Sequence, residues 1–426
     1  MQQSSPTHTS DHSKALFMVP RYWPGTGGAE LHSRELARQL SLRGPVGVVR
    51  HCSDETAAAE LAYAQAPTLQ LDDNGIPLYQ LGARGPLHGP LTLAARYYQR
   101  HRLARPVFSA LYKTMTRDRL LTIARDYDLL HAVYNGFTPS AELAAEVCQR
   151  LDKPFVWTPL AHTSLPPGSG WSSRGFRRLY QRADALIAMT AYEREWLIGQ
   201  GAHPDRVHVC PVSTLLADTA DAAQFRADYQ LGEHPFVLYL GRMTEAKGYR
   251  LLSQATAAVW EQNPTTRFVF LGPPSAASER WFAEHQDPRI LTPGLLSERD
   301  KTSALAACNM LCVPSVEESL GVMYLEAWSF AKPVIAVDLP VLRTVINAGG
   351  DGLLVKPQAE AIASALNQLL ANPAAGAEMG RQGAQKVAEN YNWPVIAERM
   401  ASIHRHVLSG NAAALSDATP SHWQAA

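Results

Sequence analysis

Short apolar segments alternate with longer segments of helical periodicity along most of this chain, and that alternation restricts its fold more than any other feature. A first series of predicted strands covers residues 15–20, 46–50, 76–81, 129–134, 154–159, 185–189 and 207–210. A second series covers residues 236–240, 267–271, 309–313, 333–337 and 352–355. Strands that alternate with helices are typical of βαβ units with mainly parallel sheets, so the sequence predicts an α/β protein.

A polar segment rich in Ala and Asp, residues 214–228, separates the two series and is the predicted domain boundary. Beyond the second series, a last helix has an apolar face and begins after Asn392, its predicted cap, so it should dock on an apolar surface. That face consists of Ile396, Met400, Ile403 and Val407. The predicted segments are a mobile tail at 1–13, domains at 14–215 and 216–392, the helix at 393–409 and a mobile tail at 410–426.

Charge and hydropathy narrow the function classes. The 39 basic and 39 acidic residues cancel, which argues against overall nucleic-acid binding. No apolar run reaches the roughly 18 residues of a membrane span, and the polar start of the chain lacks a signal-peptide pattern, so a cytoplasmic protein is expected. The five cysteines show no CxxC spacing, which predicts reduced, mostly buried thiols in place of disulfides or a zinc site.

The most specific local pattern spans residues 312–337 and reads as strand, turn, helix and strand. Glu318 falls in the turn, Gly321 allows close approach of the backbone to a ligand, and a helix predicted to begin near Val322 would offer free N–H groups to a phosphate. Glu326 follows eight residues after Glu318, a helical rise of roughly 12 Å, which is too long for a pair of hydrolase carboxylates. The two could hold opposite ends of a nucleoside diphosphate sugar; the alternative is a pair of solvated glutamates.

A second pattern places Arg242 just past a strand and Lys247 on the loop that opens the next helix. Both cations could reach one anion and stabilise a leaving diphosphate as it gains charge. The alternative is a basic surface loop.

In the first series, Gly25, Gly27 and Gly28 lie between a strand and a helix. A dinucleotide fingerprint would require glycine where Glu30 stands, so this loop either packs closely against a substrate or is only a tight turn. His162 follows directly on a predicted strand and is expected at the same edge of the sheet, with a structural histidine as the alternative.

Residues 96–119 contain seven Arg or Lys against one acid, interleaved with aromatic residues, and residues 174–182 add a second basic cluster. Such helices can contact an anionic membrane or a phosphorylated acceptor, although a solvated helix face is the simpler interpretation. Asp126 and Asp128 match a literal DxD metal pattern but are predicted to form only a turn between helix and strand.

Taken together, the segment Gly27–Glu30, His162, the pair of Arg242 and Lys247, and the glutamates eight residues apart resemble the retaining glycosyltransferases of the GT-B fold, in particular family four. The resemblance spans most of the chain. It implies two Rossmann-like domains facing a cleft, with the nucleotide sugar on the C-terminal domain, the acceptor on the N-terminal domain, and the last helix crossing back to the N-terminal domain.

The resemblance also assigns roles. His162, Glu318, Arg242 and Lys247 would be catalytic: the two cations would bind the diphosphate, Glu318 the donor sugar, and His162 the sugar near the reacting carbon. The donor-sugar site would extend over Ser319, Leu320, Gly321 and Val322. Glu326 would bind the ribose hydroxyls, and Gly27 and Gly28 would form the loop on the acceptor side.

For this family, retention without an evident nucleophile implies attack from the same face, with the departing phosphate oxygen helping to deprotonate the acceptor hydroxyl. No cofactor or metal is expected, and the acceptor would be a glycan, a lipid-linked molecule or a small molecule. Residues 211–214 depart from the usual family pattern, so the resemblance does not extend to the hinge geometry. Three alternatives stay open: a GT-B sugar-nucleotide epimerase or phosphorylase, a non-catalytic nucleotide-sugar-binding protein, and, less favoured, a Rossmann dehydrogenase.

Overall fold

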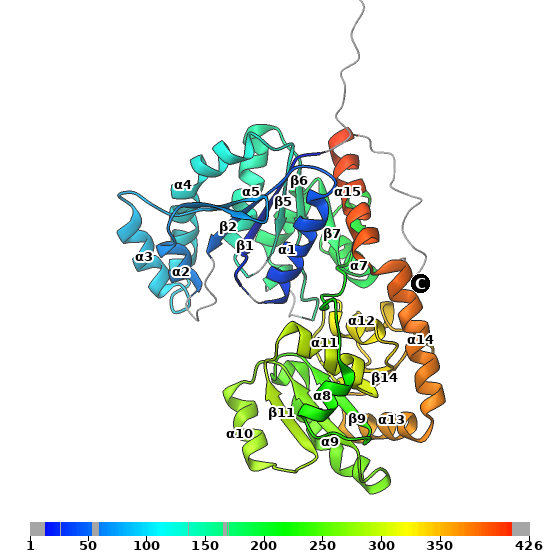
Figure 1. Cartoon of the computed structure of the whole chain (residues 1–426). Helices are drawn as coiled ribbons and strands as arrows, with labels where there is room; N and C mark the ends of the chain where they lie inside the picture. The colour runs from blue at the N-terminus through cyan, green and yellow to red at the C-terminus, as the bar shows by residue number, and fades with distance from the viewer. Residues whose placement is uncertain are drawn as a thin grey trace, which may run out of the picture.

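The computed structural model describes residues 13–25, 27–52, 59–134, 136–164, 168 and 170–410. It consists of two sheets, each covered by helices, one above the other in Figure 1. We call the eight-stranded sheet with its helices the N-terminal unit and the six-stranded sheet with its helices the C-terminal unit. The predicted tails lie outside the described residues except for Ser13 and Gly410 at their inner edges.

The sheet of the N-terminal unit has the order β3-β4-β2-β1-β5-β6-β7-β8. Its strands are β1 (Ala15–Arg21), β2 (Val46–Cys52), β3 (Leu69–Asp73), β4 (Ile76–Gln80), β5 (Leu129–Val133), β6 (Phe155–Thr158), β7 (Ala185–Ala188) and β8 (Val207–Val209). Its helices are α1 (Gly28–Ser41), α2 (Ala59–Gln65), α3 (His88–Tyr97), α4 (Ala104–Ala124), α5 (Thr138–Leu151), α6 (Arg174–Arg182) and α7 (Ala191–Gly199). The central strands are buried on both faces, which explains their largely apolar sequences; Arg50, His51 and His131 are buried polar exceptions.

The sheet of the C-terminal unit has the order β11-β10-β9-β12-β13-β14, and every paired strand in it is parallel. Its strands are β9 (Phe236–Leu240), β10 (Arg267–Leu271), β11 (Ile290–Gly294), β12 (Met310–Val313), β13 (Val334–Val337) and β14 (Gly352–Val355). Its helices are α8 (Ala222–Asp228), α9 (Tyr249–Gln262), α10 (Ala276–Glu284), α11 (Glu298–Ala307), α12 (Val322–Trp328), α13 (Ala359–Ala371) and α14 (Pro373–Asn390).

The last helix, α15 (Trp393–Ser409), returns to the N-terminal unit, where it lies beside α1 in Figure 1. Asn392 caps it as predicted, because its side chain accepts the Val395 N–H at 3.0 Å. The buried face of α15 includes Ile396, and His404 contacts His131 of β5 with 3.1 Å between the ring nitrogens. The predicted α/β class with two mainly parallel sheets and a returning helix is therefore confirmed.

The chain passes from the N-terminal unit to the C-terminal unit after β8 and returns before α15, and the two passages touch. The Trp393 ring N–H donates to the Thr214 carbonyl at 2.9 Å, and the Ser213 hydroxyl donates to the Tyr391 carbonyl. The segment predicted to be a boundary contains no strand, but its end forms helix α8.

Two strands were not predicted from the sequence, β3 and β11, and each lies at an edge of its sheet. Strand β3 pairs antiparallel with β4 through a turn at Asn74 and Gly75, which both have positive φ angles. All five cysteines are free and buried, as predicted. Among the described residues, no helix is both long and apolar enough to cross a bilayer.

Candidate active site

The loops that follow β9 and β12 form one structural unit at the carboxyl edge of the second sheet. These strands are neighbours, and their loops are joined because the Val316 N–H and the Ser315 hydroxyl both donate to the Ala246 carbonyl, at 2.9 and 3.0 Å. Gly248 has φ +74°, and a Cβ there would lie 2.0 Å from the Pro314 carbonyl oxygen. Only glycine lets the two loops approach this closely.

The contact between the loops brings together two residues predicted from separate motifs. Lys247 Nζ lies 2.6 Å from Glu318 Oε1, and the Glu318 side chain is only 6% exposed. Arg242, on the same loop as Lys247, is exposed, and its guanidinium has no side-chain partner in the described part of the chain. The loops thus present one paired cation and one unpaired cation.

Helix α12 begins at Val322, as predicted, and Gly321 ends the loop before it. Gly321 has φ +78°, and a Cβ there would lie 2.5 Å from the Tyr324 ring, so glycine is required at this position. Ser319 is half-buried, whereas the Leu320 side chain belongs to the hydrophobic core. Leu320 can therefore offer a ligand its backbone but not its side chain.

Glu326, the second predicted glutamate, is buried and bound to a lysine that the sequence analysis did not identify. Lys301 of α11 places its Nζ 2.8 Å from Glu326 Oε1 and also donates to the Leu215 carbonyl at 2.7 Å. Burial lowers the pKa of Lys301, but Glu326 and then Glu298 more than offset this effect, so the pKa lies above its ordinary value. Each of the two predicted glutamates is therefore paired with a lysine.

His162 lies just beyond β6 on a tightly held loop of the N-terminal unit. Leu160 adopts φ +47°, an unfavourable value for a residue with a side chain. The Trp171 indole N–H donates to the Pro159 carbonyl at 2.9 Å, and the Trp171 ring also lies 4.8 Å from the His162 ring. The residues before and beside the imidazole therefore fix its position.

Glu193 of α7, another residue that the sequence analysis missed, holds the same loop through hydrogen bonds to its backbone. It is 1% exposed, and its two carboxylate oxygens accept the backbone N–H groups of Ala161 and Met189, each at 2.7 Å. Burial raises the pKa of Glu193 to about 7, although both hydrogen bonds oppose the shift. The Thr190 side chain caps α7 by accepting the Glu193 N–H, and the spacing of Thr190 and Glu193 matches a capping box. The Glu193 carboxylate, however, binds the backbone of the His162 loop.

The His162 loop faces the loops of the C-terminal unit. Partial burial lowers the pKa of the imidazole, Glu317 and Glu318 oppose this shift, and Lys247 and Arg242 reinforce it. These interactions require His162 to lie within electrostatic range of residues that come 80 or more positions later in the chain. The structure thus brings together His162, Arg242, Lys247 and Glu318.

The predicted glycine loop precedes α1. A Cβ on Gly27 would lie 2.3 Å from a carboxylate oxygen of Glu30, a buried residue whose other oxygen is 3.5 Å from Arg21 Nε. A Cβ on Gly28 would meet nothing within 4 Å. A larger residue at position 27 would therefore displace the Glu30 carboxylate, while Gly28 leaves open space at the start of the helix.

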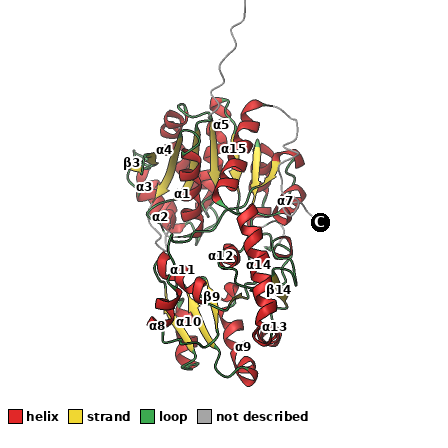
Figure 2. Ribbon diagram, turned by 45° about the vertical axis from the view of Figure 1, so that its right-hand side comes forward, coloured by secondary structure: helices red, strands yellow, loops and turns green. Residues whose placement is uncertain are grey.

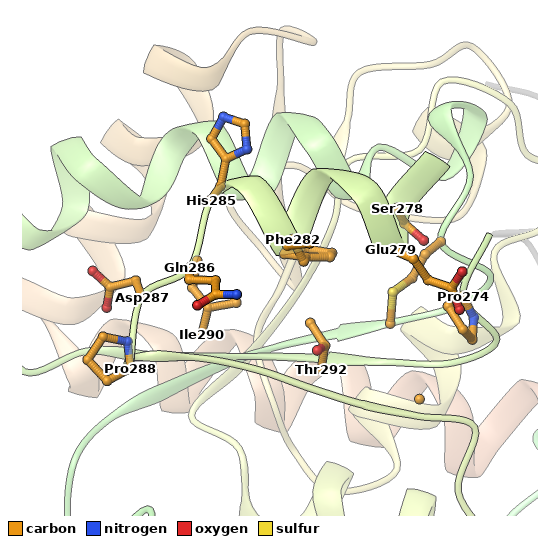
Figure 3. Close-up of a pocket in the computed structure, with 13 residues that line it drawn as sticks. Pro274, Ser278, Glu279, Phe282, His285, Gln286, Asp287, Pro288, Ile290 and Thr292 are labelled. Atoms are coloured by element: carbon orange, nitrogen blue, oxygen red, sulfur yellow. The ribbon is translucent and has the colours of Figure 1, made fainter. Parts of the chain in front are cut away.

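A cavity of about 850 Å³ lies in the C-terminal unit between α10 and the edge strand β11. Figure 3 shows Phe282 of α10 facing Thr292 of β11, with Asp287 near one end and Pro274 near the other. Met243, the neighbour of Arg242, also lines it. The cavity is thus adjacent in the chain to the cation loop but does not include His162 or the two glutamates. Within the described ranges, no cluster of three or more His, Cys, Asp or Glu side chains could hold a metal ion.

Comparisons with protein families match both halves of the chain. The model described as Glycosyl transferases group 1 matches residues 221–386, and the Glycosyl transferase 4-like domain matches residues 27–213. A D-inositol 3-phosphate glycosyltransferase of Kineococcus radiotolerans is 29% identical, covering 92% of this chain and 94% of that protein. A protein of the same name from Frankia alni is 30% identical, covering 68% of this chain and 76% of its own length.

Solved structures agree with the arrangement of the two sheets. Anabaena HepE in complex with UDP and glucose superposes with a TM-score of 0.70 at 19% identity, covering 94% of this chain and all of HepE. Sucrose-phosphate synthase from Thermosynechococcus elongatus gives a TM-score of 0.70 at 21% identity, covering 93% of this chain and all of that enzyme.

Proposed function

Because this chain belongs to the group 1 glycosyltransferases of the GT-B fold, we propose that it moves a sugar from a nucleoside diphosphate donor to an acceptor hydroxyl and retains the anomeric configuration. The observation that carries the proposal is the convergence of His162 with Arg242, Lys247 and Glu318 from the other unit. A sugar bound between the units would contact the imidazole on one side and the two loops on the other.

The charges at this point suit a donor that carries two phosphates. Arg242 has no side-chain partner in the described ranges and can bind an anion without breaking an existing contact. Lys247 would exchange its bond to Glu318 for one to phosphate, which frees the Glu318 carboxylate to accept sugar hydroxyls. UDP and glucose in the HepE structure are consistent with such a donor. Glu326 would bind the ribose hydroxyls beside Lys301.

Retention and independence from metal ions are part of the same proposal. Two cations beside the departing diphosphate would supply the positive charge that the transition state requires. In the described structure the acidic neighbours of His162 are Glu317, which is exposed, and Glu318, which is paired with Lys247, and we assign neither of them the role of nucleophile. We propose that the acceptor hydroxyl attacks the anomeric carbon from the face on which the bond to the diphosphate breaks, and that a phosphate oxygen of the leaving group takes the hydroxyl proton.

A donor and acceptor screen tests the proposal. Nucleoside diphosphate sugars would be ranked by thermal shift, and each positive donor would then be incubated with inositol phosphates, oligosaccharides and lipid-linked sugars, with and without a chelator. A product whose anomeric coupling in NMR matches that of the donor is expected, at an unchanged rate with the chelator. Inverted product, or turnover lost with the chelator and restored by a divalent metal, would contradict the mechanism.

The same experiment separates the alternatives. An epimerase would isomerise the donor without an acceptor, and a phosphorylase would need inorganic phosphate. A non-catalytic protein would bind the donor and leave it intact.

His162→Ala should slow transfer far more than it weakens donor binding, so full turnover of that variant would remove His162 from the site.

A further inference from the structure

The basic segment predicted at residues 96–119 divides into two parts with different electrostatic environments. Lys113 on α4 is bound to Glu142 and Glu146 of α5, at 2.8 Å from each, and Arg117 lies 3.4 Å from Glu146. The second part is therefore largely neutralised inside the fold. The first part contains no acid from residue 93 to residue 107, and Glu60 of α2, which lies beside it, accepts a hydrogen bond from Gln99 at 2.9 Å and forms no ion pair with its arginines in the described structure.

Four arginines concentrate this charge where α3 ends and α4 begins. They are Arg96, Arg100, Arg102 and Arg105, and all four are exposed. Arg105 packs on Tyr98, with its Nε 3.2 Å from the Tyr98 carbonyl. In the described part of the chain no carboxylate pairs with any of the four.

Large apolar side chains are exposed among these arginines. Leu103 is 82% exposed at the turn before α4, and Val107 is 51% exposed one helical turn further on. On α3, Leu93 is 57% and Tyr97 is 43% exposed, at positions i and i+4 of one face. We call the exposed side chains of residues 93–107 the α3–α4 surface. In Figure 1, α3 lies at the end of the N-terminal unit remote from α15.

We propose that the α3–α4 surface binds an anionic lipid bilayer, with the arginines at the headgroups and Leu103 inserted at the boundary with the acyl chains. The combination of apolar side chains with unpaired cations fits a lipid surface, since headgroups neutralise the cations while the interface buries the apolar groups. A second copy of the chain would bring like charges together, and a soluble phosphate would leave Leu103 exposed.

This inference does not depend on the proposed transfer reaction. It adds that the acceptor is presented at, or close to, a membrane surface, and it accounts for exposed apolar side chains on a chain with no membrane-spanning helix in its described part. Vesicle binding without any sugar substrate tests it separately from catalysis.

The full-length protein would be floated with vesicles of phosphatidylglycerol or of phosphatidylcholine. Binding to the anionic vesicles alone is expected, and it should weaken as salt rises. Because each basic residue near an anionic membrane raises the partition coefficient about fivefold, Arg100→Glu with Arg102→Glu should lower it at least ~25-fold. Leu103→Asp should lower it at least ~10-fold through lost apolar insertion.

Matched controls sit elsewhere on the N-terminal unit. Leu42→Asp changes another leucine that is 70% exposed, and Arg125→Glu with Arg150→Glu makes the same change in net charge on exposed arginines. Both control proteins should float like the unchanged protein. Several outcomes would overturn the proposal: no flotation, equal loss in the controls, or flotation that Leu103→Asp leaves intact while duplex DNA or inorganic phosphate competes. Dimers in sedimentation that Leu103→Asp dissociates would assign the surface to a second copy and overturn it as well.

Discussion

At the scale of single residues, two lysines neutralise the two glutamates of the C-terminal unit, and this pairing determines how the site responds to a ligand. Lys247 holds Glu318 and Lys301 holds Glu326. Neither carboxylate is buried without a counter-ion, which would be costly. A donor must therefore exchange partners with existing ion pairs.

Replacing Lys247 should weaken donor binding without unfolding the protein. Lys247→Ala removes one charge-assisted bond to the diphosphate, worth about 1.5–3 kcal/mol, so the Kd should rise about 10- to 150-fold. Calorimetry with the donor found by the screen measures this change. Lys356→Ala, an exposed lysine of the same unit, is the control and should bind normally. Equal affinity in both variants would remove Lys247 from the donor site.

Glu193 should influence catalysis through the loop that it holds. In Glu193→Gln, one side-chain position that accepts a backbone N–H becomes a donor, so Ala161 or Met189 loses its partner and the His162 loop shifts. We expect kcat to fall at least ~10-fold while the donor Kd stays within about twofold, as for a misplaced group near the reaction. Glu195→Gln, exposed on the same helix, should leave kcat unchanged. A parallel loss of donor affinity would indicate a general structural defect.

The same glutamate should make stability depend on pH. Its pKa is raised in the folded protein from 4.5 to about 7, so the folded state holds a proton that the unfolded state releases between these values. The contribution of Glu193 to stability therefore falls as pH rises from about 4.5 to about 7. When the pH is raised from 5 to 8, the Tm of the Glu193→Gln variant should fall by less than the Tm of the unchanged protein. Identical pH profiles would contradict the assignment.

At the scale of elements, the sequence predicted the strands whose residues are buried on both faces and missed those at the sheet edges. Continuous apolar runs such as β9 carry a clear signal. Strand β3 is mostly exposed, and only the Asn74–Gly75 turn before β4 could have revealed it. Strand β11 is only half-buried and contains Pro293, which is tolerated because the strand lies at an edge.

The sequence could predict those residues of the site that come directly after a strand in the chain. His162, Arg242 and Glu318 all lie just beyond carboxyl ends of parallel strands, and a sequence reports that position. Lys301 reaches Glu326 because α11 packs on α12, and Glu193 reaches the backbone of the His162 loop because α7 packs against that loop. Sequence spacing does not encode such contacts between elements, so neither residue stood out.

The joined loops after β9 and β12 make a prediction at this scale. Gly248→Ala puts a Cβ 2.0 Å from the Pro314 carbonyl at a positive φ, so it should destabilise the protein by about 2 kcal/mol or more and weaken donor binding. Gly199→Ala, at the end of α7, meets nothing within 4 Å and should be neutral or stabilising. Urea unfolding compares the two. Equal stability would mean that the loops can separate without cost.

At the scale of the whole molecule, helix α15 completes the hydrophobic core of the N-terminal unit, whose strands come far earlier in the sequence. Ile396 on α15 is fully buried, and its carbonyl accepts a hydrogen bond from the Cys210 thiol just after β8. Figure 2 shows α15 among the elements of the N-terminal unit and α14 on the C-terminal unit. The N-terminal unit is therefore incomplete until α15 has been synthesised.

Shortening Ile396 should accordingly affect the distant half of the sequence. Ile396→Ala should cost about 2–5 kcal/mol by leaving a cavity. Hydrogen exchange is expected to accelerate in α1 and β8 more than in β9 or α9. Leu408→Ala, 37% exposed on the same helix, should cause neither effect. Uniform acceleration across both units would show that they unfold together.

The two passages of the chain between the units lie side by side, hydrogen-bonded through Thr214 with Trp393 and Ser213 with Tyr391. A single connection would let one unit swivel freely on the other. Two adjacent, hydrogen-bonded connections restrict the rotation of one unit on the other more than a single connection does, so they limit how far His162 can move sideways relative to Lys247. For the transfer reaction proposed above, the two connections would bring His162 back opposite Lys247 each time the units separate and close.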